Sequence, residues 1–239
     1  MTSALALRGV SAGYGPFAAL FDVSLSVGEG EAVALLGANG VGKTTVARVA
    51  TGLVRPTAGS VEIGGSVLTG APTYRFAQAG VLHAPEGRSV FATLSVEENL
   101  MLSFRRSRGR SGANAALEES FGLFPSLADR RNQLAGTLSG GEQRMLSMAR
   151  VLVEAPKLLV ADELSLGLAP IVAREVYATL ARLRAAGTSL LIVEQHVAQA
   201  LALCDRAIVL DHGSVSWEGP AADAAQRVAT KVFERSDGA

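Results

Sequence analysis

The chain lacks three features that would place it in special classes of protein. It has one cysteine among its 239 residues, Cys204, which excludes an internal disulfide framework and fits a reducing compartment. Its net charge is zero, whereas a protein built mainly to bind nucleic acid needs an excess of Lys and Arg. No apolar run approaches the roughly 18–20 residues that cross a bilayer, and residues 1–15 contain neither a basic leader nor a long apolar core. We therefore expect a soluble cytosolic protein without nucleic acid as its partner.

The first 68 residues predict antiparallel strands together with one strand–loop–helix unit. Alternation over residues 20–27 puts Phe21, Val23, Leu25 and Val27 on one face of a half-buried strand. The other elements expected here are a strand over residues 31–36, a glycine-rich loop followed by a helix that starts near Gly42, and a strand pair over residues 59–68 that turns at Gly64 and Gly65.

The rest of the chain predicts an α/β sheet domain that contains a helical insertion. Residues 95–154 have the apolar periodicity of helices, and short apolar strands then alternate with helices, as in a parallel sheet. The expected elements are strands over 157–162 and 188–194, helices over 170–186 and 197–203, and a hairpin over 207–219 that turns at His212 and Gly213. We expect one domain over residues 1–239, with a core of about 1–85 and 156–239 and a helical insertion of about 86–155. The arginine-rich run at residues 105–110 reads as a solvated turn of this insertion.

A phosphate-binding loop is the most specific motif in the sequence. Residues 37–44 match the pattern G-x-x-x-x-G-K-[ST], in which glycines let successive backbone N–H groups point at phosphate oxygens at a helix N-terminus. Lys43 would reach the β- and γ-phosphates, and Thr44 would offer its hydroxyl to Mg²⁺. The predicted strand and helix on either side disfavour a plain glycine-rich turn. The candidate phosphate-contacting residues are Gly37, Ala38, Asn39, Gly40, Val41, Gly42, Lys43, Thr44 and Thr45.

Two acidic residues end a predicted apolar strand over 158–163. In a parallel sheet the carboxyl ends of the strands face the ligand. Asp162 could therefore hold Mg²⁺ through water, and Glu163 could act as the general base that polarises an attacking water. An acidic pair after a strand is by itself more often a helix-cap turn, but the phosphate loop favours the functional interpretation.

The segment Leu138–Gln143, with the sequence LSGGEQ, identifies the superfamily. Ser139 and Glu142 have the spacing of a capping box, and a capped helix N-terminus with Gly140 and Gly141 is also an anion site. With this segment, which we call the signature, the chain resembles the ATP-binding cassette (ABC) ATPases over nearly its whole length. The resemblance implies an α/β P-loop NTPase cassette with a mixed β-sheet core, N-terminal antiparallel strands and an inserted helical subdomain.

The resemblance also implies how the site is completed. Two cassettes would meet head to tail, so that each ATP with its Mg²⁺ lies between one phosphate loop and the partner's signature residues Ser139, Gly140, Gly141 and Glu142. Tyr14 sits where the family places an aromatic residue that stacks on adenine. The alternative for Tyr14 is a surface turn tyrosine between Gly13 and Gly15.

Two positions depart from the usual family pattern. Glu86 stands where the Q-loop glutamine normally contacts Mg²⁺ and the membrane subunit, and a carboxylate there can still contact the metal. The second position is that of the family's switch histidine, which lies near the γ-phosphate. Counting ten residues back from Asp205 places it at Gln195, whereas counting forward from Glu163 favours His196. We favour Gln195, which can hydrogen-bond the γ-phosphate but cannot carry a histidine's charge. His196 is equally well explained as a polar residue at a helix start.

Three short segments resemble one subgroup, the smaller ATPase subunit of branched-chain amino-acid importers. They are residues 85–88, 165–170 and 193–195. The resemblance implies an ATP-hydrolysing motor subunit at the cytoplasmic face of the inner membrane. Its partners would be a second cassette, two transmembrane permease subunits and, indirectly, a periplasmic-type binding protein. The alternatives are a cassette for urea, amides or another small solute, a non-transport ABC ATPase that remodels DNA or ribosomes, and a degenerate cassette that binds ATP without hydrolysis.

Overall fold

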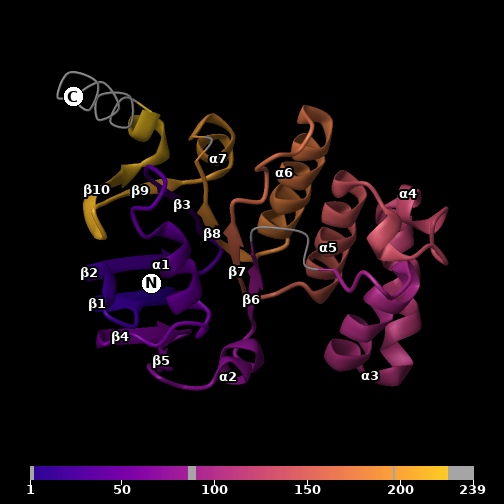
Figure 1. Ribbon diagram of the computed structural model, residues 1–239, viewed down its shortest axis with the longest axis horizontal. Helices are drawn as coiled ribbons and strands as arrows, with labels where there is room; N and C mark the ends of the chain where they lie inside the picture. The colour runs from indigo at the N-terminus through magenta and orange to yellow at the C-terminus, as the bar shows by residue number, and fades with distance from the viewer. Residues whose placement is uncertain (1–2, 86–89, 196, 226–239) are drawn as a thin grey trace. The chain divides into compact units, whose positions relative to one another are not determined.

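The computed structural model describes residues 3–85, 90–195 and 197–225 (Figure 1). The chain divides into two compact units. The sheet unit contains the described residues up to His83, Lys157–Glu163, and the described residues from Gly187 onward. The helical unit contains the described residues of Ala84–Pro156 together with Leu164–Ala186. Within the described ranges, no helix is both long enough and apolar enough to span a membrane.

A six-stranded sheet forms the centre of the sheet unit, in the order β10-β9-β3-β8-β7-β6. β3 pairs in parallel with β8 and β9, β8 pairs in parallel with β7, and β10 pairs antiparallel with β9. The carboxyl ends of β3, β7, β8 and β9 therefore lie at the same edge of the sheet. The bounds of the strands are β3 Ala32–Leu36, β6 Val81–Ala84, β7 Leu158–Asp162, β8 Ser189–Val193, β9 Arg206–Asp211 and β10 Ser214–Pro220.

A second, antiparallel sheet has the order β2-β1-β4-β5, with β1 Ser3–Tyr14, β2 Phe17–Gly28, β4 Ala58–Ile63 and β5 Ser66–Val67. The prediction that Phe21 lies on the buried face of β2 is wrong. Phe21 is 50% exposed, whereas Leu20 is fully buried. Asp22 has a positive φ of 51°, and the register with β1 shifts by one residue here, so that the alternation reverses before Val23. Val23, Leu25 and Val27 are buried as predicted.

Both predicted hairpin turns are confirmed. Gly64 and Gly65 connect β4 to β5 with φ values of 54° and 77°, and His212 and Gly213 connect β9 to β10 with φ values of 45° and 78°. Two successive residues of positive φ are typical of the tight turns whose twist matches paired strands.

Helices of the sheet unit include α1 Lys43–Ala50, α2 Thr73–Gln78 and α7 Val197–Leu203, and the described residues 221–225 are also helical. α1 contacts strands of both sheets. Its buried Val46 and Val49 share one apolar core with Leu7 of β1 and Leu35 of β3. This core anchors the helix that follows the phosphate loop.

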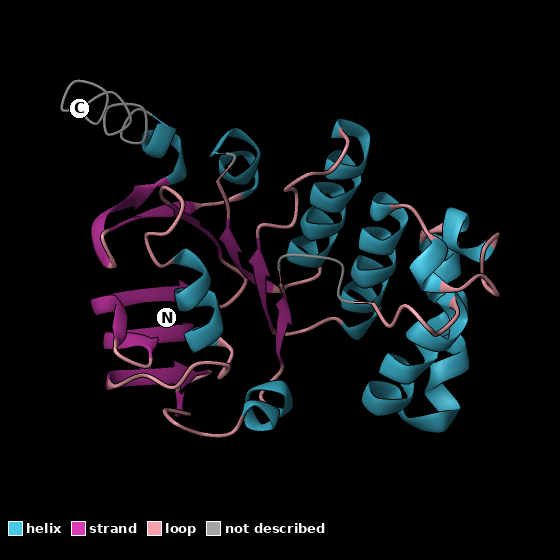
Figure 2. Ribbon diagram, viewed as in Figure 1, coloured by secondary structure: helices cyan, strands magenta, loops and turns pink. Residues whose placement is uncertain are grey.

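The helical unit consists of helices joined by loops (Figure 2). Its elements are α3 Val96–Leu123, α4 Pro125–Ala128, the short 3-10 helix η1 Ala135–Thr137, α5 Gly140–Glu154 and α6 Pro170–Ala185. Gly109, with φ 69° and ψ 179°, interrupts α3 within the arginine-rich run. α6 packs with α5 and groups with the helical unit, although its residues fall within the range 156–239 expected for the core.

Candidate functional site

Three loops that carry predicted site residues leave the same edge of the six-stranded sheet. β3 leads into the phosphate loop (Gly37–Thr44), β7 leads into Glu163, and β8 leads into Glu194 and Gln195. β8 lies between β3 and β7, so the three loops are neighbours. The carboxyl ends of parallel strands are where α/β sheets bind ligands.

The phosphate loop has a backbone that only glycine accommodates well. Gly37, Gly40 and Gly42 have φ values of 155°, 78° and 106°. A Cβ atom on Gly37 would lie 2.5 Å from the carbonyl oxygen of Leu210, which is closer than atoms pack in folded proteins. The loop is therefore fixed by both dihedral angle and space.

The amide groups of this loop are available to a ligand. Among the described residues, none accepts a hydrogen bond from the backbone N–H groups of residues 38–45, and Gly42 caps α1 without a side-chain hydrogen bond. A run of free N–H groups at a helix N-terminus forms an anion-binding nest. The residues present therefore fit the phosphates of a nucleotide.

Lys43 is folded back over the phosphate loop. Its side chain is 4% exposed, and its ammonium nitrogen donates to the carbonyl oxygens of Gly37 and Ala38 at 3.0 and 3.1 Å. The same nitrogen lies 3.5 Å from Oε1 of Glu163. A buried cation at the mouth of an amide nest is suited to neutralise phosphate charge.

Asp162 and Thr44 bring two hard oxygen ligands together. Asp162 is 1% exposed, and the Thr44 hydroxyl donates to its Oδ1 at 3.4 Å. Within the described ranges, no three His, Cys, Asp or Glu side chains form a metal cluster. One carboxylate and one hydroxyl suit Mg²⁺, which commonly completes its shell with water and substrate phosphate.

Glu163 adopts an unusual backbone conformation. Its φ is 47°, and its N–H donates to the carbonyl oxygen of Val193 at 2.9 Å, which ties the end of β7 to β8. Non-glycine residues held at positive φ occur disproportionately at functional sites. The conformation accompanies the approach of the Glu163 carboxylate to the Lys43 ammonium.

A buried carboxylate, that of Glu194, accepts a hydrogen bond from the backbone of Gln195. Glu194 is 2% exposed, its N–H donates to the carbonyl oxygen of Leu35 at 3.2 Å, and its Oε2 accepts from the Gln195 N–H at 3.3 Å. The Gln195 side chain is exposed just beyond β8. His196 and Glu86 lie outside the described residues.

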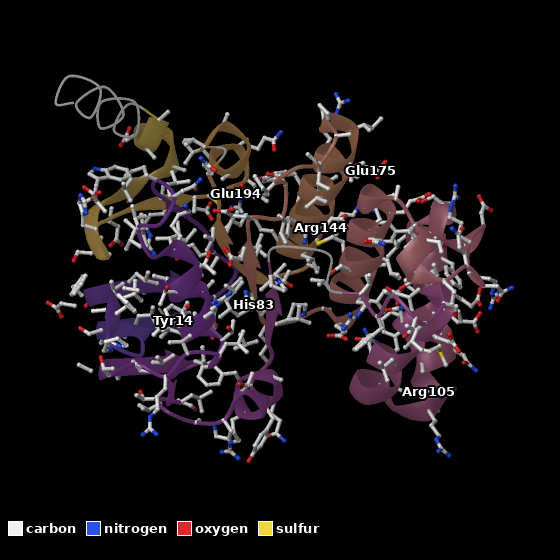
Figure 3. The ribbon with its side chains drawn as sticks, viewed as in Figure 1. Tyr14, His83, Arg105, Arg144, Glu175 and Glu194 are labelled. Atoms are coloured by element: carbon white, nitrogen blue, oxygen red, sulfur yellow. The ribbon has the colours of Figure 1, made fainter. Side chains whose placement is uncertain are left out.

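Tyr14 ends β1 and is held by an arginine from α1. The Nη1 atom of Arg48 donates to the Tyr14 hydroxyl at 3.1 Å, and its guanidinium carbon lies 5.9 Å from the ring centroid. His83 lies on β6 (Figure 3), and burial, followed by the positive charge of Arg48, lowers the pKa of His83 to about 4. The sequence gives no signal for the contact between Arg48 and Tyr14, because a basic residue near a helix C-terminus is common.

The signature opens α5 in the helical unit with the predicted capping box. The Ser139 hydroxyl accepts from the Glu142 N–H at 3.3 Å, and a Glu142 carboxylate oxygen accepts from the Ser139 N–H at 2.8 Å. These backbone and side-chain hydrogen bonds from Ser139 lower the pKa of Glu142. A Cβ atom on Gly141 would lie 3.0 Å from Val172 of α6, so the helix start is also closely packed.

Comparison with known proteins identifies the family. Residues 20–165, more than half of the chain, match the protein family described as "ABC transporter". The chain belongs to this family. It is an ABC-type ATPase cassette, which binds and hydrolyses ATP.

Two curated relatives cover most of the chain. This chain is 42% identical to the "High-affinity branched-chain amino acid transport ATP-binding protein BraG" of Pseudomonas aeruginosa. The match spans 206 residues, which are 86% of this chain and 88% of the relative. This chain is 34% identical to the "Lipopolysaccharide export system ATP-binding protein LptB" of Escherichia coli over 83% of both chains.

Solved structures confirm the predicted fold class. The "Structure of ATP binding subunit of ABC transporter" is 26% identical, with a TM-score of 0.84 over 95% of this chain and 94% of that chain. An ATP-binding cassette of an ABC transporter in its ADP conformation gives a TM-score of 0.83 at 25% identity over the full length of both chains. The antiparallel sheet, the mixed sheet and the helical unit are all expected of an ABC cassette.

Proposed function

We propose that this chain is the motor subunit of a membrane importer for branched-chain or other hydrophobic amino acids. The observation that carries the motor function is the convergence of the Lys43 ammonium, the free amides of the phosphate loop and the Glu163 carboxylate at one sheet edge. The solute class is supported by the 42% identity to a branched-chain amino-acid transport protein over 86% of the chain.

The side chains of the site would divide the reaction among them. The amides of residues 38–45 and the Lys43 ammonium bind the phosphates, and Tyr14 stacks on the adenine. Thr44 and Asp162, with Glu86, would hold Mg²⁺, which neutralises phosphate charge when bound. A carboxylate oxygen of Glu163 accepts a proton from the attacking water. The Gln195 side chain, or that of His196, donates a hydrogen bond to the γ-phosphate.

The partners follow from the division between the two units. Ser139, Gly140, Gly141 and Glu142 belong to the helical unit, and we propose that they complete the nucleotide site of a second cassette. Two permease subunits at the cytoplasmic face of the membrane would bind this chain, and a periplasmic-type binding protein would deliver the solute to them. The relatives named as transport ATP-binding proteins support this assembly.

The ATPase role is tested by Glu163→Gln, which keeps the shape of the side chain and removes its basicity. We expect steady-state ATP hydrolysis to fall at least about 100-fold while ATP binding is retained, because the lost step is proton acceptance. Glu29→Gln, an exposed carboxylate in the same unit, is the matched control and should hydrolyse ATP at the wild-type rate. Turnover by Glu163→Gln near the wild-type rate would remove Glu163 from the base role.

The transport role is tested by the membrane proteins that co-purify with the chain from its native membrane. We expect two importer permeases and a second cassette, with ATPase activity of the reconstituted complex stimulated by leucine together with its binding protein. A second candidate is a lipopolysaccharide exporter, favoured by the 34% identity to a protein of that name. Recovery of an exporter permease instead would contradict the importer proposal.

A further inference from the structure

Arg48 is the exposed residue of an otherwise buried helix. Of the eight residues of α1, six are buried and Thr44 is half-buried, whereas Arg48 reaches the surface in the last turn. Its guanidinium contacts Tyr14, which comes from β1, 34 residues earlier in the chain. α1 starts at Lys43, so the helix that begins at the phosphate loop also reaches the aromatic residue.

The contact with Tyr14 accounts for the orientation of Arg48. Within the described ranges no ion pair includes Arg48, so no carboxylate directs its guanidinium elsewhere. Its position in the last turn complements the helix dipole, but that effect needs only a positive charge and no particular direction. The hydrogen bond to the Tyr14 hydroxyl and the approach to the ring do set a direction.

The contact with Arg48 matters because the Tyr14 ring is partly exposed. It is 43% exposed at the end of β1, next to the turn that begins at Gly15. A ring of this kind loses rotational freedom when it stacks on a ligand, and a side chain that is already oriented loses less. A fixed ring therefore gives a flat base tighter binding than a mobile ring would.

We propose that Arg48 is a positioning residue that orients the Tyr14 ring for stacking on the adenine of ATP. The proposal rests on the proposed function, in which Tyr14 contacts adenine. Through Arg48, one rigid helix would place both the phosphate loop and the base platform, so that the two ends of the nucleotide are recognised in a fixed relation.

The test compares a ligand that has a base with one that has none. Binding of Mg·ATP and of Mg·tripolyphosphate is measured by calorimetry for the wild type, Arg48→Ala, Tyr14→Ala and the double variant. We expect Arg48→Ala to weaken ATP binding about 3- to 10-fold and to leave tripolyphosphate binding within about twofold. The double variant should bind ATP no more weakly than Tyr14→Ala does, because Arg48 acts through Tyr14.

Two further variants separate positioning from general effects of charge or folding. Tyr14→Phe keeps the ring and removes the hydroxyl that Arg48 bonds, so its ATP affinity should lie between those of the wild type and Tyr14→Ala. Arg8→Ala removes an arginine of β1 that pairs with Glu62 at 2.9 Å, and it should bind both ligands as the wild type does.

Three results would overturn the inference. Equal weakening of tripolyphosphate and ATP binding by Arg48→Ala would mean that Arg48 acts on the phosphate loop or the phosphates. Additive losses in the double variant would mean that Arg48 acts independently of Tyr14. Unchanged ATP binding by Arg48→Ala would also refute it, whereas a wild-type protein that binds no ATP would instead refute the proposed function.

Discussion

The starts of α1 and α5 both carry motifs that we propose bind nucleotide, but their backbone N–H groups differ in how many are already hydrogen-bonded. At α1, Gly42 has positive φ, no side chain caps the helix, and the amides of residues 38–45 have no described acceptor. At α5, Ser139 and Glu142 cap each other's backbone N–H groups. The start of α1 keeps all of these N–H groups for a ligand. At the start of α5 the N–H groups of Ser139 and Glu142 are satisfied, whereas those of Gly140 and Gly141 have no acceptor among the described residues.

This difference indicates what each helix start needs from outside the chain. Unpaired N–H groups carry a free-energy cost that an anion removes, so the phosphate loop is a strong phosphate site by itself. A capped helix start is already stable, and it would gain less from a phosphate. The partial cap is consistent with our proposal that the signature completes the nucleotide site of a second cassette.

The largest expected effect is at the phosphate loop. Gly37→Ala introduces a Cβ atom 2.5 Å from the Leu210 carbonyl oxygen, so we expect a loss of about 1–3 kcal/mol in unfolding free energy, by urea denaturation, and strongly weakened ATP binding. Gly40→Ala is the control, because its Cβ would meet nothing within 4 Å and only its φ of 78° is unfavourable. A Gly37→Ala protein as stable as Gly40→Ala would show that the loop is not closely confined.

A smaller effect is expected at the signature cap. Ser139→Ala removes a side-chain cap, and we expect a loss of about 1 kcal/mol in unfolding free energy with little change in ATP affinity. Ser95→Ala removes an equivalent capping box at the start of α3, outside the signature. Both variants should lose similar stability, but only Ser139→Ala should lower the ATPase rate of the assembled dimer. Equal ATPase rates in the two would argue against a role of Ser139 in the partner's site.

The smallest expected effect is the dependence of the α5 cap on pH. Hydrogen bonds from Ser139 hold the pKa of Glu142 below its usual value of 4.5, so the carboxylate stabilises the fold above pH 4.5. This contribution should be lost as the pH falls below 4.5 and through the folded-state pKa. Thermal unfolding between pH 6 and pH 3 should therefore show a steeper loss of stability for the wild type than for Glu142→Gln. Identical slopes would contradict the cap's dependence on charge.

Local patterns in the sequence predicted most of the elements. The strand before the phosphate loop, the helix after it, both hairpin turns and the capping box of α5 agree with the structure. These features depend on residues close together in the chain: glycines at positive φ, a serine three residues before a glutamate, and short apolar runs. The roles assigned to the site residues remain predictions.

Other features depend on neighbours distant in sequence, and these were missed. The extra residue of β2 near Asp22 is defined only by pairing with β1, and it exposes Phe21. α6 groups with the helical unit because it packs against α5, although it follows a strand of the sheet. The contact of Arg48 with Tyr14 joins residues 34 positions apart. None of these has a local signal.

The sequence by itself determined the family motifs, the phosphate loop and the acidic pair after β7, because each is a short run whose residue types and spacing dictate its local geometry. Only the tertiary structure decided that β8 lies between β3 and β7, that Lys43 reaches Glu163, and that Glu194 is buried beside Gln195. The order of strands in a sheet follows from how both of its faces are covered, and that is a property of the whole packed chain.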